Sequence, residues 1–229
     1  GFGLQRYTQE PYLAAGQLQW RSGPERSLDD SVIASLSKPF SPHGGTKVLS
    51  GNLGRAVMKT SAVPHGHQII EGPAVVFDSQ HDVGPAFESG ALNRDCVVVV
   101  RYQGPRAIGM PELHKLMPPL GVLLDRGFKV ALVTDGRLSG ASGKVPSAIH
   151  VTPEAYCGGL LAKIRNGDRV RVDGVSGELS LLVDEVELAT RHPALPDISA
   201  FHVGCGRELF GALREQLTGA EQGACCIRF

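Results

Sequence analysis

The chain has 229 residues, and its 23 Lys and Arg residues balance its 23 Asp and Glu residues. This length suffices for one large or two small domains with a sizeable core. The zero formal charge, the lack of a long basic run and the lack of an apolar stretch of about 20 residues argue against nucleic-acid and membrane partners and predict a cytoplasmic protein.

Residues 1–40 differ in texture from the rest of the chain, because they carry the only Trp and two of the four Tyr. We interpret them as a connecting segment. The Ser-Leu-Asp-Asp stretch within them predicts a capped short helix over residues 32–36. Because the sequence starts without Met, we expect it to be part of a longer chain.

Three short β-branched runs predict strands that are buried on both faces, at residues 74–77, 96–101 and 129–134. Between the last two, the stretch 111–127 predicts a helix, with a Pro suited to its first turn and a Gly to its end. We expect the pair Pro118-Pro119 to break this helix into two.

Further along, residues 167–184 alternate polar and apolar side chains around two glycines, which predicts an antiparallel hairpin with one wet face. The residues alone therefore indicate a strand-rich α/β fold, a parallel core with an appended hairpin. Apolar residues at helical spacing in 206–217 predict a surface helix, and we expect a loose tail over 218–229.

The segment TDGRLSGASGKVP follows the third strand, where open α/β sheets place their ligands. It does not match a Walker phosphate loop, because Leu138 and Val145 occupy required Gly and hydroxyl positions. It also lacks the Gly-x-Ser-x-Gly of a hydrolase elbow around Ser139. Glycine amides and the charges of Arg137 and Lys144 favour an anion site. A Gly-rich turn with solvated side chains is the alternative.

The stretch TDGRLSGASGKVPSAIHVTPEA resembles the second signature of the dihydroxy-acid dehydratase/6-phosphogluconate dehydratase family. GNLGRAVMKTSAV and VVVVRYQGPRAIGMPELHKLMPPLGVLLDRG resemble its sugar-acid branch, typified by 6-phosphogluconate dehydratase. The resemblance covers about residues 1–217. It implies the carboxyl-terminal portion of such an enzyme, a swivelling β/β/α domain over 41–217. The expected body is strand-rich and barrel-like, has flanking helices and packs against an amino-terminal domain.

The resemblance implies a hydro-lyase that removes water from 6-phospho-D-gluconate to give 2-dehydro-3-deoxy-6-phosphogluconate, a step of the Entner–Doudoroff route of gluconate metabolism. Ser139 matches the serine that acts as an alkoxide base for the C2 proton, which requires a metal or fixed donors beside it. Glu112, in GMPE, matches a ligand of Mg²⁺. The alternatives are a structural loop serine and an ordinary carboxylate in the first turn of a helix.

The resemblance also implies an iron–sulfur cluster, expected as 4Fe-4S and ligated in the amino-terminal domain, and a homodimer of the full-length enzyme. The five cysteines here are odd in number and lack CxxC spacing, so we interpret them as small buried residues or tail thiols. We therefore expect the isolated chain to be inactive.

A sugar phosphate also needs anion contacts, for which Arg suits bidentate and Lys point-charge binding. Our candidates for substrate binding are Arg137, Gly140, Ser142, Lys144, Arg106, Asn52 and Lys59. Ile108 departs from the polar Asn expected beside Glu112. Two other functions stay open: a related sugar-acid or dihydroxy-acid dehydratase, and a non-catalytic domain that binds an anion or a partner.

Overall fold

A computed structural model describes residues 7–139 and 143–227. The chain divides into two compact units, Gly1–Gly44 and Gly45–Phe229. In the first unit, β1 (Gln9–Ala14) pairs antiparallel with β2 (Gln17–Ser22). The two residues between them, Ala15 and Gly16, both have positive φ, at 51° and 76°, as a tight two-residue hairpin turn requires. Residues 1–40, which we interpreted as a connecting segment, therefore contain a β-hairpin.

The helix predicted over residues 32–36 is wrong, because the structure has turns there. Asp29 accepts hydrogen bonds from both the amide and the hydroxyl of Ser31, at 2.9 and 2.6 Å. This local side-chain turn competes with helix formation. So short a segment also lacks the length that makes a helix stable without packing.

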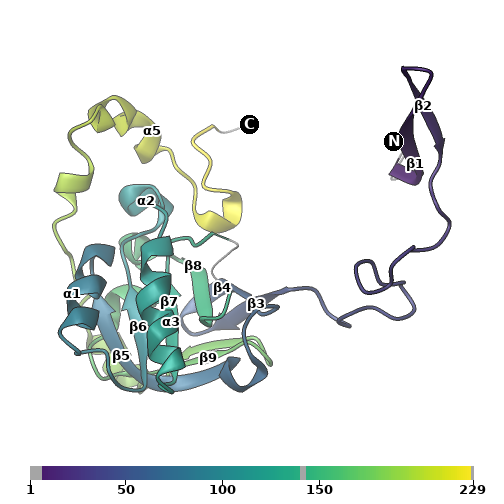
Figure 1. The fold of residues 1–229 in the computed structure, drawn as a ribbon. Coiled ribbons are helices and arrows are strands. Elements are labelled where there is room, and N and C mark those ends of the chain that lie inside the picture. Colours follow the sequence, from purple (N-terminus) through teal and green to yellow (C-terminus); the bar gives the residue numbers. More distant parts are fainter. Residues whose placement is uncertain (1–6, 140–142, 228–229) are drawn as a thin grey trace. The chain divides into compact units, whose positions relative to one another are not determined.

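In the second unit, the described strands form a closed barrel in the order β10-β3-β4-β8-β7-β6-β5-β9 (Figure 1). The barrel-like α/β fold that the family resemblance implied is confirmed. The bounds of the strands are β3 (Thr46–Gly51), β4 (Gly54–Lys59), β5 (Ile69–Phe77), β6 (Cys96–Val100), β7 (Val130–Thr134), β8 (Ser147–Thr152), β9 (Arg169–Asp173) and β10 (Glu178–Leu181).

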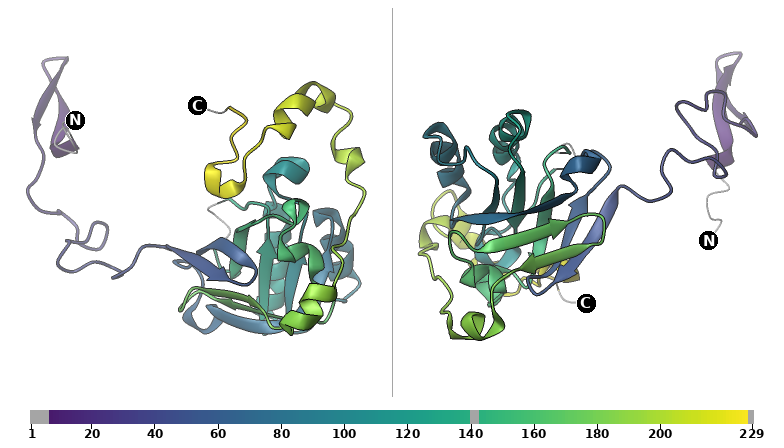
Figure 2. Two further views of the ribbon diagram at one scale, coloured as in Figure 1. Left: turned by 180° about the vertical axis from the view of Figure 1, so that it is seen from behind. Right: turned by 90° about the horizontal axis from the view of Figure 1, so that it is seen from below.

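Parallel and antiparallel pairing divide the barrel wall. Strands β5, β6, β7 and β8 are parallel neighbours, whereas β4 pairs antiparallel with both β3 and β8. The predicted hairpin, β9–β10, is present but is not an appendage. It joins β5 on one side and β3 on the other, and so completes the barrel (Figure 2). The alternation of polar and apolar residues could not predict this pairing, because it shows which face of a strand is buried and not which strands lie beside it.

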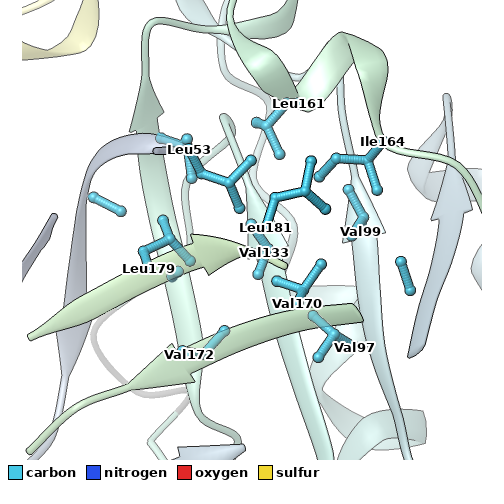
Figure 3. Close-up of a cluster of buried hydrophobic side chains, with 14 of the residues drawn as sticks. Leu53, Val97, Val99, Val133, Leu161, Ile164, Val170, Val172, Leu179 and Leu181 are labelled. Atoms are coloured by element: carbon cyan, nitrogen blue, oxygen red, sulfur yellow. The ribbon is translucent and has the colours of Figure 1, made fainter. Parts of the chain in front are cut away.

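The barrel interior is filled by aliphatic side chains that alternate along the strands. Figure 3 shows Val97, Val99 and Val133 from the parallel wall facing Val170 and Leu181 from the hairpin, all almost fully buried. Burying each such side chain stabilises the fold by roughly 1.5–3 kcal/mol. The interior is therefore a packed core.

A second core lies outside the parallel wall, between β6, β7 and two helices, α1 (Val83–Glu88) and α3 (Met117–Asp125). The other faces of these strands, such as Val98 and Leu132, pack here with Leu120 and Leu123 of α3. Burial on both faces explains why the two strands have continuous apolar runs.

Helix α3 begins later than the sequence predicted. Pro118 and Pro119 lie in its first turn and do not divide it, because first-turn amides lack intrahelical acceptors and a Pro there costs nothing. A 3-10 turn, His114–Leu116, precedes the helix. The helix ends before Gly127, whose φ is +91°, as predicted. Glu112 therefore precedes the helix and is not a carboxylate of its first turn.

The remaining helices are short: α2 (Pro105–Ile108), α4 (Glu185–Thr190) and α5 (Gly211–Glu215). The surface helix predicted over 206–217 is thus confirmed only in part, because a 3-10 turn, Arg207–Phe210, precedes α5.

In the expected tail, Glu221 pairs with Arg55 at 3.0 Å. None of the described helices is long and apolar enough to cross a membrane.

Candidate active site at the carboxyl ends of the parallel strands

The loops after β6 and β7 bring Glu112 and Ser139 into contact. The Ser139 amide donates a hydrogen bond to Glu112 Oε1 at 2.8 Å. Glu112 also forms an isolated parallel bridge with Arg137. Because β6 and β7 are parallel neighbours, their carboxyl ends meet at one edge of the sheet. This topology makes residues 27 positions apart adjacent.

Arg137 holds the two loops together. Its guanidinium donates to Glu112 Oε2 at 3.1 Å and to the Met110 carbonyl at 2.7 Å. Its own carbonyl accepts from the Leu113 amide at 3.2 Å. The Arg137 and Glu112 side chains are 50% and 32% exposed, so their ion pair adds at most about 1 kcal/mol of stability. The contacts therefore matter more for orienting Glu112 than for stability.

Ser139 lines a pocket of about 160 Å³ together with Lys59, which ends β4. The other lining residues are Thr46, Val57, Leu138, Val145, Ser147 and Ile149. The pocket that these two residues line is small and mainly apolar. In such surroundings a charge interacts more strongly with an anion than it does in water.

The structure places other candidate residues elsewhere. Lys144 pairs with both oxygens of Asp125 at 2.7 Å. Asn52 donates to the Leu181 carbonyl and accepts from its amide, both at 2.8 Å, and so fixes the end of β10. The Arg106 guanidinium contacts Cys157 Sγ at 3.7 Å.

Gly140 and Ser142 lie outside the described residues. Roles in substrate binding for Lys144, Asn52, Arg106 and these two residues stay predictions.

Sequence reasoning missed two buried carboxylates at this end of the barrel, Asp135 and Glu154, which are 0% and 4% exposed. Burial raises the pKa of Asp135 to about 6, even though three backbone amides donate to it. Burial also raises the pKa of Glu154. An acidic residue directly after a mainly apolar strand was a signal that could have identified Asp135 as a buried carboxylate.

His150 on β8 was also missed. Its φ of 57° lies in the left-handed region, and its amide donates to the Gly136 carbonyl at 2.9 Å. Burial, together with the charge of Arg137, lowers the pKa of its imidazole. The ring is therefore neutral at neutral pH, and nothing in the sequence pattern around it indicated this.

The residues that could ligate a metal are dispersed. Within the described ranges, no three His, Cys, Asp or Glu side chains come together. Burial raises the pKa of the Cys96 thiol to about 11 and also raises that of Cys157, and a thiol must lose its proton to ligate. The described cysteines do not fit an iron–sulfur cluster. Glu112 fits Mg²⁺ as one ligand, since each carboxylate oxygen has a lone pair beyond the one it uses here.

Comparison with known proteins agrees with this architecture. The family model for the Dihydroxy-acid/6-phosphogluconate dehydratase C-terminal domain matches residues 31–224. The chain therefore belongs to the dihydroxy-acid/6-phosphogluconate dehydratase family.

Among its relatives, phosphogluconate dehydratase of Escherichia coli (strain K12) is 76% identical over 229 residues, 100% of this chain and 38% of that protein. Phosphogluconate dehydratase of Pseudomonas aeruginosa is 61% identical over 227 residues, 98% of this chain and 37% of that protein. Dihydroxy-acid dehydratase of Pyrococcus furiosus is 43% identical over 166 residues, 71% of this chain and 29% of that protein. The chain thus spans less than two fifths of the length of these relatives.

Proposed function

We propose that this chain is the carboxyl-terminal part of a 6-phosphogluconate dehydratase, which removes water from 6-phospho-D-gluconate to give 2-dehydro-3-deoxy-6-phosphogluconate. The observation that carries the proposal is the contact between Glu112 and Ser139 on adjacent loops. The 76% identity to a phosphogluconate dehydratase over the whole chain supports this substrate.

In the proposed reaction, Ser139 takes the proton from C2 of the substrate. The C3–O bond breaks, and the departing hydroxide takes up a proton to leave as water, which balances the proton taken from C2. The resulting enol moves a proton from O2 to C3 and becomes the 2-keto acid. A serine hydroxyl is a weak base at neutral pH, so its alkoxide needs stabilising charge nearby. Lys59, which lines the same pocket as Ser139, supplies a cation for this purpose or for a substrate anion.

Glu112 is the proposed ligand of Mg²⁺, held in place by the Arg137 guanidinium and the Ser139 amide. When bound, the ion neutralises the substrate carboxylate and so makes C2 more acidic. Arg137 orients the Glu112 carboxylate and keeps a positive charge beside it. The proposed base and the proposed metal ligand thus lie on two loops that hydrogen bonds link to each other.

Other parts of the proposal rest on the family. We propose that an iron–sulfur cluster is ligated by an amino-terminal domain, that this domain packs against residues 41–217, and that the full-length enzyme is a cytoplasmic homodimer. Membership in the family supports these points.

The proposal is tested by assaying the full-length protein with 6-phosphogluconate, gluconate and a 2,3-dihydroxy acid in competition. We expect a preference for the phosphorylated acid of at least about tenfold in kcat/KM, because charged hydrogen bonds to a phosphate are worth about 1.5–3 kcal/mol. Equal or better turnover of the unphosphorylated acids would assign the chain to another branch of the family, which the 43% identity to a dihydroxy-acid dehydratase makes the natural competitor.

A further inference from the structure

The Asp135 carboxylate joins the loops that follow three parallel strands. Its Oδ1 accepts from the Gln103 amide at 2.9 Å, and its Oδ2 accepts from the amides of Tyr102 and Ala155 at 3.2 and 2.9 Å. Tyr102 and Gln103 follow β6, Asp135 follows β7, and Ala155 follows β8. These three partners are all backbone amides, so the side chain acts as a clamp on backbone positions.

One of the clamped positions is strained. Tyr102 has φ of 61° although it is bulky and almost fully buried, and such a conformation costs of order 1–3 kcal/mol. It persists only where the surroundings determine it, and the hydrogen bond from its amide to Asp135 is one such determinant. Further along the same loop, Met110 is also left-handed, with φ of 52°. The path from β6 to Glu112 is therefore imposed by tertiary contacts.

Glu154 secures the next part of the same loop. Its carboxylate accepts from the amides of Arg106 and Ala107, each at 3.2 Å. A Cβ added to Gly104 would overlap this carboxylate, so only glycine permits the close approach. The two buried carboxylates thus tie the Glu112 loop to the loops after β7 and β8.

We propose that Asp135 is a positioning residue that sets the distance between Glu112 and Ser139. Asp135 begins the loop that carries Ser139, and its oxygens fix the start of the loop that carries Glu112. A change of about 1 Å between catalytic groups costs up to about a hundredfold in rate. This inference rests on the proposed function for its kinetic consequence but not for its structural one.

A buried carboxylate with only a structural role offers a matched control. Asp173 is 3% exposed and accepts from the amides of Val175 and Ser176 at 2.9 and 2.8 Å. It lies in the β9–β10 hairpin beside the start of β5, whereas Asp135 follows the carboxyl end of β7. Asp173→Asn and Asp135→Asn each replace one of two acceptor oxygens with an amide group at opposite ends of the same barrel, and Asp173→Asn also weakens an ion pair with Arg171.

The test compares the full-length protein with its Asp135→Asn and Asp173→Asn variants. In hydrogen–deuterium exchange we expect Asp135→Asn to accelerate exchange at least about tenfold in both 102–113 and 136–139, and Asp173→Asn to leave those segments unchanged. With 6-phosphogluconate, kcat should fall at least about tenfold in Asp135→Asn and stay within about twofold in Asp173→Asn. The Mg²⁺ concentration for half-activation should rise only in Asp135→Asn.

Exchange in Asp135→Asn confined to one of the two segments, or equal kinetic losses in both variants, would overturn the proposal. If Asp135→Asn does not fold, Glu154→Gln is the second variant, because it keeps one acceptor oxygen for the same loop. It is expected to accelerate exchange in 102–113 and to raise the Mg²⁺ requirement, and its failure to do either would count against the proposal. If the wild-type protein does not dehydrate 6-phosphogluconate, the proposed function fails, while the exchange measurement still decides the positioning role.

Discussion

The two ends of the barrel each bury an aspartate, and the pKa values of the two carboxyl groups shift in opposite directions. At the site end, burial raises the pKa of Asp135 to about 6, and three amide donors do not compensate. At the hairpin end, burial also acts to raise the pKa of Asp173. There, hydrogen bonds from Ser176 and Val175 and the guanidinium of Arg171 outweigh it, and the pKa is lowered.

The difference lies first in burial, which outweighs the hydrogen bonds at Asp135 but not those at Asp173, and then in the surrounding charge. Arg171 lies 2.8 Å from Asp173, whereas the charged group acting on Asp135 is another carboxylate, Glu154. A cation stabilises the ionised form and a like charge destabilises it. At the hairpin end, the ionised Asp173 carboxylate is therefore stabilised by an ordinary ion pair with Arg171. At the site end, no positive charge among the described residues offsets the burial of the Asp135 carboxyl group, and such perturbed acids often occur at functional sites.

The largest expected effect is a difference in kcat/KM between substitutions at the two ends of the barrel. Glu112→Gln in the full-length protein should lower kcat/KM at least about a hundredfold, because neutralising substrate charge through a metal is worth several kcal/mol. It should also raise the Mg²⁺ requirement. The control is Glu178→Gln, which breaks an ion pair with Arg171 at the hairpin end and should change kcat/KM less than twofold. Equal losses would remove the special role of Glu112.

The next effect concerns two lysines. Lys59→Ala should raise KM or lower kcat about tenfold, because a charged contact is worth about 1.5–3 kcal/mol. Lys144→Ala should change both constants less than twofold, since the Lys144 ammonium is bound by both oxygens of Asp125. Steady-state kinetics on the two variants checks this. A larger kinetic loss in Lys144→Ala than in Lys59→Ala would instead favour Lys144 as the contact to the substrate anion.

A third effect is on stability at the site end. Gly104→Ala should lower the free energy of unfolding by about 1–3 kcal/mol, because its Cβ would overlap the Glu154 carboxylate. Gly66→Ala is the matched control, since nothing lies within 4 Å of a Cβ at that position. Chemical unfolding of the two full-length variants measures the difference. Similar stabilities would mean that the loop after β6 adapts freely.

The smallest effect is a pH dependence with opposite sign at the two ends. Because the folded-state pKa of Asp135 is raised, the folded state binds more protons than the unfolded state between about pH 4 and 6. The stabilising contribution of Asp135 is therefore complete below about pH 4 and is lost as pH rises through about 6. The Tm gap between wild type and Asp135→Asn should narrow over this range.

For Asp173, whose pKa is lowered, the stabilising contribution is present above about pH 4 and is lost as pH falls further. The Tm gap for Asp173→Asn should thus narrow on acidification. Thermal unfolding of the wild type and both variants from about pH 3 to 7 tests both signs. If the Tm differences of Asp135→Asn and Asp173→Asn from the wild type changed with pH in the same direction, the opposite pKa shifts of the two aspartates would be contradicted.

Local pattern predicted much of the wall of the barrel. The runs that became β5, β6 and β7 and the hairpin β9–β10 were all evident, because burial on one or two faces leaves a period in the sequence. The pairing of β9 with β5 left no such trace, and the proline pair was misinterpreted because its effect depends on its place in a helix.

The site divides in the same way. Ser139 and Glu112 were identified from motifs that resemble the family, and the parallel strands bring them together. Asp135 and Glu154 were not, because their partners are backbone amides from distant loops. Only the folded chain shows which amides need an acceptor.

The central claim, that Ser139 removes the C2 proton, is tested most directly by single-turnover kinetics of the full-length Ser139→Ala variant with 6-phosphogluconate. Loss of a general base lowers the rate by about 10²–10⁴-fold, and substrate affinity measured by calorimetry should stay within about threefold of wild type. A Ser139→Ala variant that turns over at the wild-type rate would contradict the account.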